Sequence, residues 1–494
     1  MASSKNTRQT LSREMIERPA GARDEGESAS APKLHPALIV LGSAGETGRA
    51  GEVLSLRAGR TAVLGRFDPD YDYGESVFVA PLRQRPGTNE ERPPLEFARH
   101  ISRRQVELIG ERSGRVRVKN LGKAPLRMNG ELSIESGASS LLEVGDTVAI
   151  GDDLLLLCQP RPIKLDASRF YPSDAWPAFG EADSCGIVGE SLPVWQLRDR
   201  LAFVAQMSQH ALVTGPTGSG KELAAQAIHA LSSRGKQALV AHSAADIPAT
   251  LVEAELFGNR ANYPNAGMPG REGLIGAANG STLFLDELGM LPTDLQAKLL
   301  RVLDEQGSYR RLGVDEPQRS DFRLVGATNR PLEFIKPDLL ARLKHVITLP
   351  PLTERAEDVP LLAAHLLARI AARDAEGAIV RRFQREGHVP LSLDLVDSLA
   401  RHLYSANLRE LEQLLLSALY GSGGAEVGLS TEVEAQLRFA ARRQVIDPEE
   451  VSCDAVRATL EECEWNISRA AAQLGWSRFQ LNRKMKKCGI EGRG

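Results

Sequence analysis

The sequence contains, at positions 215–222, the run Gly215-Pro216-Thr217-Gly218-Ser219-Gly220-Lys221-Glu222. Glycines allow backbone N–H groups to turn inward around phosphate oxygens, and a helix that follows such a loop directs its positive end at them. The lysine adds a full positive charge at the same place. The whole run therefore predicts a nucleotide-binding loop between a strand and a helix. The alternative is a glycine-rich turn in an unrelated α/β domain.

A second run, Ser281-Thr282-Leu283-Phe284-Leu285-Asp286-Glu287, lies downstream of the first. It is an apolar, strand-type stretch that ends in two carboxylates. Asp286 is suited to hold Mg²⁺, and Glu287 is suited to polarise a water for attack on a γ-phosphate. Glu222 stands where Ser or Thr usually supplies a hydroxyl to Mg²⁺, so its carboxylate is the second candidate metal ligand. The two runs together predict a nucleotide-hydrolysing site.

Length and composition limit the class of protein. A chain of 494 residues is long enough for about two to four domains. Its net charge of −3 gives no overall attraction to nucleic acid. No apolar run approaches the roughly 20 residues of a membrane span, and the N-terminus lacks an apolar signal core. The cysteines at positions 158, 185, 453, 463 and 488 show no metal-like pairing, so we expect reduced thiols in a cytoplasmic protein.

The form Gly-Lys-Glu at 220–222 resembles that of the bacterial enhancer-binding activators of the AAA+ class, which act on RNA polymerase containing sigma-54. The resemblance covers roughly residues 184–420, where further landmarks follow in order: Gly186-Ile187-Val188-Gly189-Glu190-Ser191, Glu255-Leu256-Phe257-Gly258, Ala327-Thr328-Asn329-Arg330, Leu349-Pro350-Pro351-Leu352 and Asn407-Leu408-Arg409-Glu410-Leu411. It implies an α/β AAA+ ATPase core over 184–352, a helical lid over 353–422, ATP and Mg²⁺ as cofactors, and a homo-oligomer that forms a hexameric ring.

The resemblance also assigns roles to single residues. Ile187 and Val188 belong to the segment near the adenine. Asn329 aligns with a sensor beside the γ-phosphate, and Arg409 aligns with a sensor in the lid. Arg342 aligns with an arginine finger, which stabilises transition-state charge at the neighbouring subunit's nucleotide.

Three places depart from the family pattern. A second finger arginine aligns with Lys336, and the Asn that restrains the catalytic glutamate aligns with Ser243. Family members contact sigma-54 through a loop that reads Gly-Ala-Phe-Thr-Gly-Ala, whereas residues 262–267 read Asn-Tyr-Pro-Asn-Ala-Gly. Tyr263 can act as a displaced aromatic tip, although Pro264 stiffens the loop. The alternative is an ordinary surface loop that does not dock sigma-54.

The N-terminal part changes character along the chain. Residues 1–33 are polar and low in apolar content, so we expect disorder. Residues 34–160 carry short strand-type runs, separated by turn residues, which predict a β-sandwich. These runs lie at 37–41, 61–64, 116–118, 147–150 and 154–157. Residues 161–183 contain prolines and no periodicity, which indicates a linker.

The β-type module resembles the forkhead-associated (FHA) domain, a β-sandwich whose loops bind phosphothreonine peptides. The resemblance implies that Arg66 and Ser102 hold the phosphate, with Arg103 nearby, and that a phosphothreonine-containing protein or a Ser/Thr kinase is a partner. Gln105 stands where family members usually have His, and Ala124 stands where they have Asn. The plainer interpretation is that Arg66 is a solvated arginine at the end of a strand and that the hydroxyl of Ser102 belongs to an ordinary turn.

The C-terminal part begins with a second linker at 423–450, which leads into an all-α domain at 451–494. Three helices are predicted there, with starts at Ser452, Ser468 and Ser477. The third is basic and resembles the recognition helix of the Fis-type helix-turn-helix. The resemblance implies binding to DNA at upstream promoter elements, with Arg478 and Gln480 at base edges. The expected phosphate contacts are Arg483, Lys484 and Lys487. The alternative is a solvated basic helix.

Three hypotheses follow for the whole chain. The first is an ATP-hydrolysing, DNA-binding transcription regulator of the sigma-54 activator family, gated by phosphothreonine-peptide binding at its β-sandwich. The second is a DNA-binding regulator or repressor that does not contact sigma-54, because the loop at 262–267 is degenerate. The third is a phosphopeptide-dependent scaffold with a vestigial ATPase, which the near-complete set of catalytic residues disfavours.

Overall fold

The structure is a computed structural model that describes residues 33–490 except 45, 47, 75, 249–250, 264, 305–306, 374–376, 386, 445–451, 464, 475 and 477. The disorder expected for residues 1–33 falls outside the described residues, apart from Lys33. Pro264 and the helix start expected at Ser477 also fall outside them. None of the described helices is both long and apolar enough to cross a membrane.

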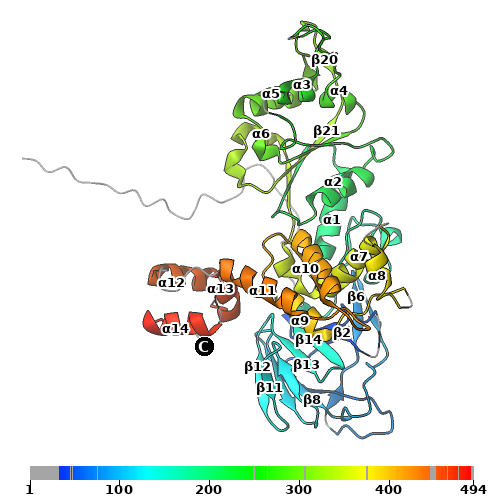
Figure 1. The fold of residues 1–494 in the computed structure, drawn as a ribbon, viewed down its shortest axis with the longest axis vertical. Helices are drawn as coiled ribbons and strands as arrows, with labels where there is room; N and C mark the ends of the chain where they lie inside the picture. The colour runs from blue at the N-terminus through cyan, green and yellow to red at the C-terminus, as the bar shows by residue number, and fades with distance from the viewer. Residues whose placement is uncertain are drawn as a thin grey trace, which may run out of the picture. The chain divides into compact units, whose positions relative to one another are not determined.

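The N-terminal part of the described chain is a β domain (Figure 1). Its strands are β1 (Leu34–His35), β2 (Ala37–Ser43), β3 (Val53–Ser55), β4 (Thr61–Leu64), β5 (Val77–Phe78), β6 (Leu82–Arg85), β7 (Thr88–Glu91), β8 (Val106–Gly110), β9 (Val116–Asn120), β10 (Leu126–Met128), β11 (Leu132–Ile134), β12 (Ser139–Leu142), β13 (Thr147–Ile150), β14 (Leu154–Cys158) and β15 (Arg161–Pro162). One sheet has the order β11-β10-β13-β14-β2-β3-β6-β7 and another has the order β12-β9-β8-β4-β5. Buried side chains of both sheets share one core, as in a β-sandwich.

Burial along the strands shows which faces of the sheets are covered. In β9 the buried and exposed residues alternate, as expected for a strand with one face toward a core. In β14 all five residues are buried. Leu154 and Leu156 belong to the core of the sandwich, whereas Leu155 and Leu157 belong to a second apolar cluster on the opposite face. This outer face is therefore covered by another part of the chain.

The central part is an α/β domain with a parallel sheet in the order β17-β18-β21-β16-β22, as predicted for the ATPase core. In sequence order its strands are β16 (Ala211–Thr214), β17 (Val240–Ser243), β18 (Thr282–Asp286), β21 (Arg323–Thr328) and β22 (His345–Thr348). The carboxyl ends of β16, β18 and β21 meet at one edge, where α/β sheets bind ligands.

Helices cover both faces of this sheet. Apolar side chains of α1 (Leu192–Gln206) and α2 (Lys221–Ala230) pack on one face. The other face packs against α3 (Val252–Phe257), α5 (Thr293–Asp304) and α6 (Pro337–Arg342). Shorter elements complete the domain: α4 (Leu274–Ala277), η2 (Leu288–Met290), η3 (Leu332–Phe334), β19 (Ser308–Tyr309) and β20 (Gln318–Arg319). The predicted linker at 161–183 contains β15 and η1 (Ser173–Ala175) and packs Leu165 and Tyr171 against α1.

A helical lid follows, with one helix more than the sequence predicts. Its elements are η4 (Leu352–Asp358), α7 (Val359–Ala371), α8 (Gly377–Arg381), α9 (Leu393–Ala400), α10 (Leu408–Gly421) and α11 (Thr431–Gln444). Helix α11 lies within residues 423–450, which the sequence assigns to a linker. Val433 is fully buried and Leu437 partly buried against the lid core, and this i, i+4 pair anchors the helix in a polar stretch.

The outer face of the β-sandwich packs against the lid. Ile39, Leu155 and Leu157 form an apolar cluster with Val396 and Ala400 of α9, so α9 lies against β2 and β14 (Figure 1). At the edge of this contact the Thr147 hydroxyl donates to the Asp397 carboxylate at 2.5 Å. The covered face explains why β2 and β14 are continuously apolar.

A buried ion pair lies elsewhere in the same junction. Nη2 of Arg161 lies 3.2 Å from Oε2 of Glu357, and 3% and 5% of these side chains are exposed. The same nitrogen donates to the carbonyl of Glu190 at 3.1 Å. Within the described part of the chain, Nε and Nη1 of Arg161 have no hydrogen-bond partner, so the pair is incompletely compensated for its burial.

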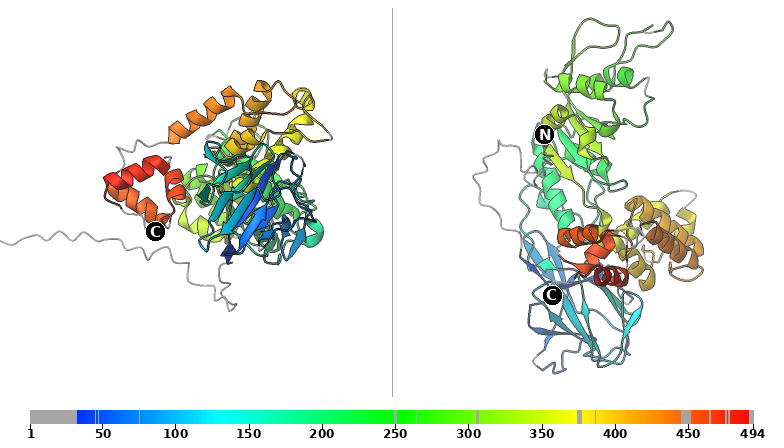
Figure 2. Two further views of the ribbon diagram at one scale, coloured as in Figure 1. Left: turned by 90° about the horizontal axis from the view of Figure 1, so that it is seen from below. Right: turned by 90° about the vertical axis from the view of Figure 1, so that its left-hand side faces the viewer.

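The C-terminal helices form a compact three-helix group, shown in red tones in Figure 2. They are α12 (Cys453–Glu462), α13 (Ile467–Gln473) and α14 (Arg478–Lys487). Helix α12 begins after Ser452 as predicted, and the side chain of Ser452 caps it. Helix α13 was expected to start at Ser468, but Asn466 caps it through a bond from the amide of Arg469, and Ser468 lies inside the helix.

The expectation of reduced thiols is wrong for one pair of cysteines in this structure. Cys453 and Cys488 form a disulfide, since the start of α12 and the residue after α14 approach to 5.5 Å between Cα atoms. Cys158, Cys185 and Cys463 are free thiols.

We predict that Glu357→Gln stabilises the protein at pH 8. Burial raises the pKa of Glu357 to about 7 from an ordinary 4.5, although Arg161 lowers it. The folded chain thus holds an extra proton between these values, and stability from this group falls as pH rises through that window. At pH 8 the variant should have a higher melting temperature than the wild type, and its free energy of unfolding should be larger by up to about 3 kcal/mol. At pH 5 the two proteins should be equally stable.

The matched control is Glu354→Gln, an exposed position on the same η4 segment. It should leave the melting temperature unchanged at both pH values. A lower melting temperature of Glu357→Gln at pH 8 would mean that the attraction of Arg161 outweighs the cost of burial.

Candidate functional site

The glycine-rich loop leaves β16 and enters α2 at Lys221. Gly218 has φ 73° and Gly220 has φ 98°, a region that glycine adopts without strain. A Cβ atom on Gly218 would lie 2.2 Å from the carbonyl oxygen of Ala406, which precedes the lid helix α10. The loop therefore tolerates only glycine where the lid approaches it.

Lys221 is buried in this loop, with 7% of its surface exposed. Its Nζ donates to two loop carbonyls at 3.2 and 3.3 Å. Burial lowers the pKa of Lys221, the nearby carboxylates of Asp286 and Glu287 raise it, and Arg409 of the lid lowers it. Lys221, the adjacent pair Asp286 and Glu287, and Arg409 come from three separate stretches of the sequence, and the structure brings them near enough to influence one another's charge.

The two carboxylates follow directly from strand β18. The amide of Glu287 donates to Oδ1 of Asp286 at 2.8 Å. Glu287 has φ 52° and ψ 41°, a left-handed conformation that costs a non-glycine residue about 1 kcal/mol or more. Such strain is typical of functional sites. Ser243, opposite Asp286 in the sheet, accepts from the amide of Ala245 at 3.3 Å, and no bond from it to Glu287 is found among the described residues.

The lid is tied to the loop through Asn407. Its Nδ2 donates to the carbonyl of Thr217 at 3.0 Å, and its Oδ1 accepts from the amide of Leu352 at 2.8 Å. The next amide, of Leu408, donates to the carbonyl of Gly218 at 3.1 Å. Asn407 is buried with φ 50°, so the surrounding bonds hold it in a sparsely populated conformation.

The two expected sensor residues both lie beside the loop. Asn329, after β21, donates from Nδ2 to the hydroxyl of Thr217 at 3.1 Å. Arg409 belongs to the first turn of α10, and its Cγ lies 3.4 Å from the position of a Cβ on Gly218. Both are therefore placed next to the phosphate-binding loop.

Glu410 fixes the segment that precedes α10. Its carboxylate accepts from the amides of Ser405 and Ala406 at 2.7 and 2.9 Å, from the Ser405 hydroxyl at 2.9 Å, and from Nε2 of His402 at 2.8 Å. Sequence reasoning included Glu410 only as part of a landmark, yet its bonds hold the backbone from which Asn407 reaches the loop.

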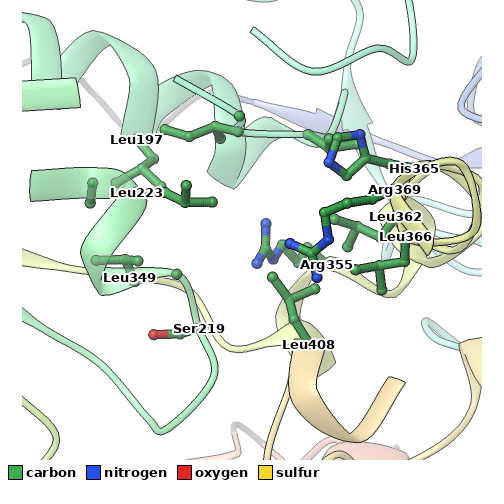
Figure 3. A pocket seen from close by; sticks show the side chains of 15 residues that line it. Leu197, Ser219, Leu223, Leu349, Arg355, Leu362, His365, Leu366, Arg369 and Leu408 are labelled. Carbon is green, nitrogen blue, oxygen red and sulfur yellow. The ribbon is translucent and has the colours of Figure 1, made fainter. Parts of the chain in front are cut away.

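A cavity opens beside the loop (Figure 3). The expected residues Ile187, Val188, Ser219 and Gly220 line it, together with a set of leucines: Leu197, Leu223, Leu349, Leu362, Leu366 and Leu408. This mostly apolar lining suits the base of a small ligand.

Three basic side chains in this cavity were missed by sequence reasoning: Arg355, His365 and Arg369. Figure 3 shows them entering it from the lid side. Burial lowers the pKa of His365, and Arg369 lowers it further, so the imidazole is neutral at pH 7. For His365 and Arg369 a signal was available, since they interrupt the apolar periodicity of α7.

The residues expected to hold Mg²⁺ have suitable chemistry. Glu222 is exposed on the first turn of α2, where Gln226 donates to it at 3.3 Å. Within the described ranges no group of three or more acidic, His or Cys side chains forms a metal site. Mg²⁺ at nucleotide sites usually takes only one or two carboxylates in addition to phosphates, which Asp286 and Glu222 can supply.

Arg342 and Lys336 lie away from the loop of their own chain. Arg342, at the end of α6, forms an ion pair with Asp304 and is half exposed. Lys336 precedes α6, and its amide donates to Gln296 at 2.8 Å. The structure therefore does not bring Arg342 to the nucleotide site of the same chain.

The loop that departs from the family pattern is folded back rather than free. Asn259 pairs with Arg271 across its base, and the carboxamide of Asn262 accepts from the amide of Gly267 at 2.8 Å. The ring of Tyr263 packs on Gly313, where an added Cβ would lie 2.6 Å from it, and 38% of Tyr263 is exposed. The aromatic side chain is thus accessible but supported by a neighbouring loop.

The candidate phosphopeptide residues lie on adjoining loops of the β-sandwich. The amide of Arg66 donates to the carbonyl of Ser102 at 3.1 Å, and Nε of Arg66 is buried without a partner in the described residues. Arg103 turns away into an ion pair with Asp68 at 2.7 Å. Gln105, at the position of the expected His, accepts from the amide of Ser102 at 3.2 Å.

The side chain of Gln105 continues into the interior of the sandwich. Its Nε2 donates to Asn120 at 2.9 Å and to the carbonyl of Ala124 at 2.8 Å. This buried network holds the Ser102 loop, and sequence reasoning had treated Gln105 only as a departure from a pattern.

The predicted DNA-binding residues all lie on α14, with different exposure. Arg483 and Lys487 are exposed, whereas Lys484 is only 8% exposed and is not presented on the surface. Arg478 and Gln480 belong to the first turn of the helix. A recognition helix usually enters the major groove with its N-terminal residues.

Comparison with known protein families gives two matches. The family described as "Sigma-54 interaction domain" matches residues 187–347. The family described as "Bacterial regulatory protein, Fis family" matches residues 448–487.

Several characterised proteins are similar over most of their length. The DNA-binding transcriptional regulator NtrC of Rhizobium meliloti is 33% identical over 353 residues, which cover 62% of this chain and 70% of NtrC. The transcriptional regulatory protein ZraR of Escherichia coli K12 is 35% identical, covering 62% of this chain and 69% of ZraR. Among solved structures, NtrX of Brucella abortus in complex with ADP is 29% identical with a TM-score of 0.46, covering 62% of this chain and 70% of NtrX.

We predict that Glu410→Gln loosens the lid from the loop. Burial raises the pKa of Glu410, but hydrogen bonds from His402, Ala406 and Ser405 lower it to about 2. The ionised carboxylate therefore stabilises the fold above about pH 4.5, and this contribution is lost as pH falls toward 2. An amide accepts fewer of these bonds, so calorimetry at pH 7 should show a loss of about 1–3 kcal/mol.

The control is Glu434→Gln on α11, whose carboxylate makes a 3.4 Å surface contact with Arg438 and should contribute little. An unchanged melting temperature for Glu410→Gln would show that the segment before α10 is held by other bonds.

Proposed function

Because the chain belongs to the family of sigma-54-dependent transcription regulators with a Fis-type helix-turn-helix, we propose that it binds and hydrolyses ATP to remodel sigma-54 RNA polymerase at promoters that it binds through α14. The observation that carries this proposal is that the loop of Lys221 lies against Arg409 of the lid and bonds to Asn329, while Asp286 and Glu287 at the end of β18 are near enough to raise the pKa of Lys221. A scaffold with a vestigial ATPase would have no need of this arrangement.

Each residue of the site has a chemical task in this proposal. Lys221 and the amides of its loop bind the phosphates, and Asp286 with Glu222 binds Mg²⁺, which neutralises phosphate charge. Glu287 polarises the attacking water. Asn329, which bonds to Thr217, and Arg409, which lies next to Gly218, sense the γ-phosphate.

Arg342 completes a neighbouring site in a ring of identical subunits, which we propose to be hexameric. Its exposed position at the end of α6, away from the loop of its own chain, supports a role in trans. In this role the guanidinium leaves Asp304 and stabilises charge that develops on the neighbour's γ-phosphate.

The β-sandwich is proposed to gate this ATPase through the lid. Its outer face packs on α9, and Arg161 pairs with Glu357 of η4, which adjoins the cavity. A phosphothreonine peptide bound at Arg66 and Ser102 would change the free energy of this junction and hence the position of the lid. Such gating requires differential affinity of the peptide for two lid positions.

A second candidate function is a DNA-binding regulator or repressor that does not contact sigma-54. The packing of Tyr263 on Gly313 favours it, because a tip that is supported by another loop is less free to insert into a partner. Both candidates share the ATPase and the DNA-binding domain.

A subunit-mixing experiment tests the ring ATPase. Lys221→Ala and Arg342→Ala should each lower ATP hydrolysis about a thousandfold or more. An equimolar mixture should regain roughly a quarter of wild-type activity, since one junction in four combines an intact loop with an intact finger. No recovery on mixing, with both variants assembled, would place Arg342 outside the neighbour's site.

A peptide-binding experiment tests the gate. A pool of phosphothreonine peptides should bind the full chain more tightly than the same pool after dephosphorylation. Arg66→Ala should weaken this binding about tenfold or more, because it removes a charge-assisted contact, while Arg99→Ala, exposed on a nearby loop, should not. Equal binding of both pools to the wild type would contradict the phosphopeptide assignment.

A further inference from the structure

Arg355 is a buried cation for which the described residues provide no hydrogen-bond or ion-pair partner. Only 5% of it is exposed, and its side chain lines the cavity beside the loop (Figure 3). Among the residues that the structure describes, no hydrogen bond or ion pair reaches its guanidinium, and its Nε is shielded from solvent. Two other buried arginines, Arg198 and Arg323, are well paired. Arg198 binds Asp183 and two carbonyls, and Arg323 donates to three carbonyls.

The backbone around Arg355 is held in place on both sides. Glu357 pairs with Arg161, and Asp358 accepts from the amides of Glu190 and Ser191 at 2.8 and 3.0 Å. Between these anchors and Leu352, the backbone at Arg355 leaves helical geometry, with φ −134° and ψ 43°. The backbone from which the Arg355 side chain extends is therefore fixed beside the cavity.

An unpaired guanidinium in this place is costly to the folded chain. Leucines make up much of the cavity wall, and transfer of an unpaired charge to such surroundings is unfavourable. Burial lowers the pKa of Arg355, and Asp358 opposes the shift, yet an arginine stays protonated at pH 7. A buried charge of this kind is accounted for if a ligand supplies its missing acceptor.

We propose that Arg355 binds the base of the nucleotide by donating hydrogen bonds to its ring nitrogens. The inference rests on the proposed function of this site as a nucleotide site. Arg355 shares the cavity with Ile187 and Val188, whereas Lys221 and Asp286 do not line it, which places it at the base end. A guanidinium only donates, and purine rings offer acceptor nitrogens at their edges.

The other basic groups of the cavity are less suited to this task. Arg369 is half exposed and paired with Glu412 at 2.9 Å. His365 is neutral at pH 7 and provides a single donor. Among the described basic side chains of this cavity, Arg355 is therefore the cation whose N–H donors have no protein acceptor.

The test compares ATP with tripolyphosphate, which lacks a base, as ligands of the full chain. Arg355→Met should bind ATP roughly ten- to a hundredfold more weakly and bind tripolyphosphate as the wild type does. Lys221→Ala should weaken both ligands. Arg373→Met, on the exposed side of the lid, should change neither.

Thermal unfolding without ligand separates binding from a structural role. A buried unpaired charge replaced by a side chain of similar length should leave the melting temperature of Arg355→Met equal to or above that of the wild type. A lower melting temperature, or unchanged ATP affinity, would overturn the assignment. Equal weakening of ATP and tripolyphosphate would assign Arg355 to the phosphates instead. A wild-type chain that binds neither ligand would reject the proposed nucleotide site itself.

Discussion

The side chain of Asn407 joins three segments on which the nucleotide site depends. One amide group donates to the phosphate-binding loop at Thr217 and accepts from Leu352, where η4 begins, while its own backbone starts α10. The residue is buried and held at φ 50°, so the lid approaches the loop only in the geometry that these bonds allow. The close approach also requires glycine at position 218, since any side chain there would collide with the lid.

The η4 segment extends the same constraint toward the rest of the chain. Successive side chains face different neighbours: Arg355 faces the cavity, Glu357 faces Arg161 of the β domain, and Asp358 caps the segment at 190–191. A ligand that engages Arg355 and a signal that alters the β domain therefore act on one short stretch of backbone. The gating that we propose would act through this stretch, which adjoins both the β domain and the cavity.

The parts that could be predicted from sequence are those fixed by local chemistry. The loop at 215–222 and the carboxylates after β18 need particular residue types at fixed spacing, and the strands at 37–41 and 154–157 follow from short apolar runs. The contact between β14 and α9 was missed, although the unbroken apolar run of β14 is a sign of burial on both faces. Helix α11 was missed because its anchors, Val433 and Leu437, are isolated in a polar stretch.

The remaining features that the sequence did not predict depend on contacts between distant parts of the chain. Cys453 and Cys488 are 35 residues apart, and only the folding of three helices brings them together. Arg355 looks unremarkable in the sequence, and only the folded structure shows that the described residues give its guanidinium no partner. Gln105 departs from a family pattern, yet the folded domain uses it to hold the Ser102 loop.

We propose that nucleotide turnover at this site is coupled to sigma-54. Binding of the purified full chain to sigma-54 can be measured in the presence of ADP and aluminium fluoride, which mimics the transition state, with the ATPase rate measured in parallel. We expect a trapped complex together with turnover, and loss of the complex when Tyr263 is replaced by alanine. Turnover without any trapped complex would rule out coupling to sigma-54 and would leave an ATP-dependent DNA-binding regulator with a different target.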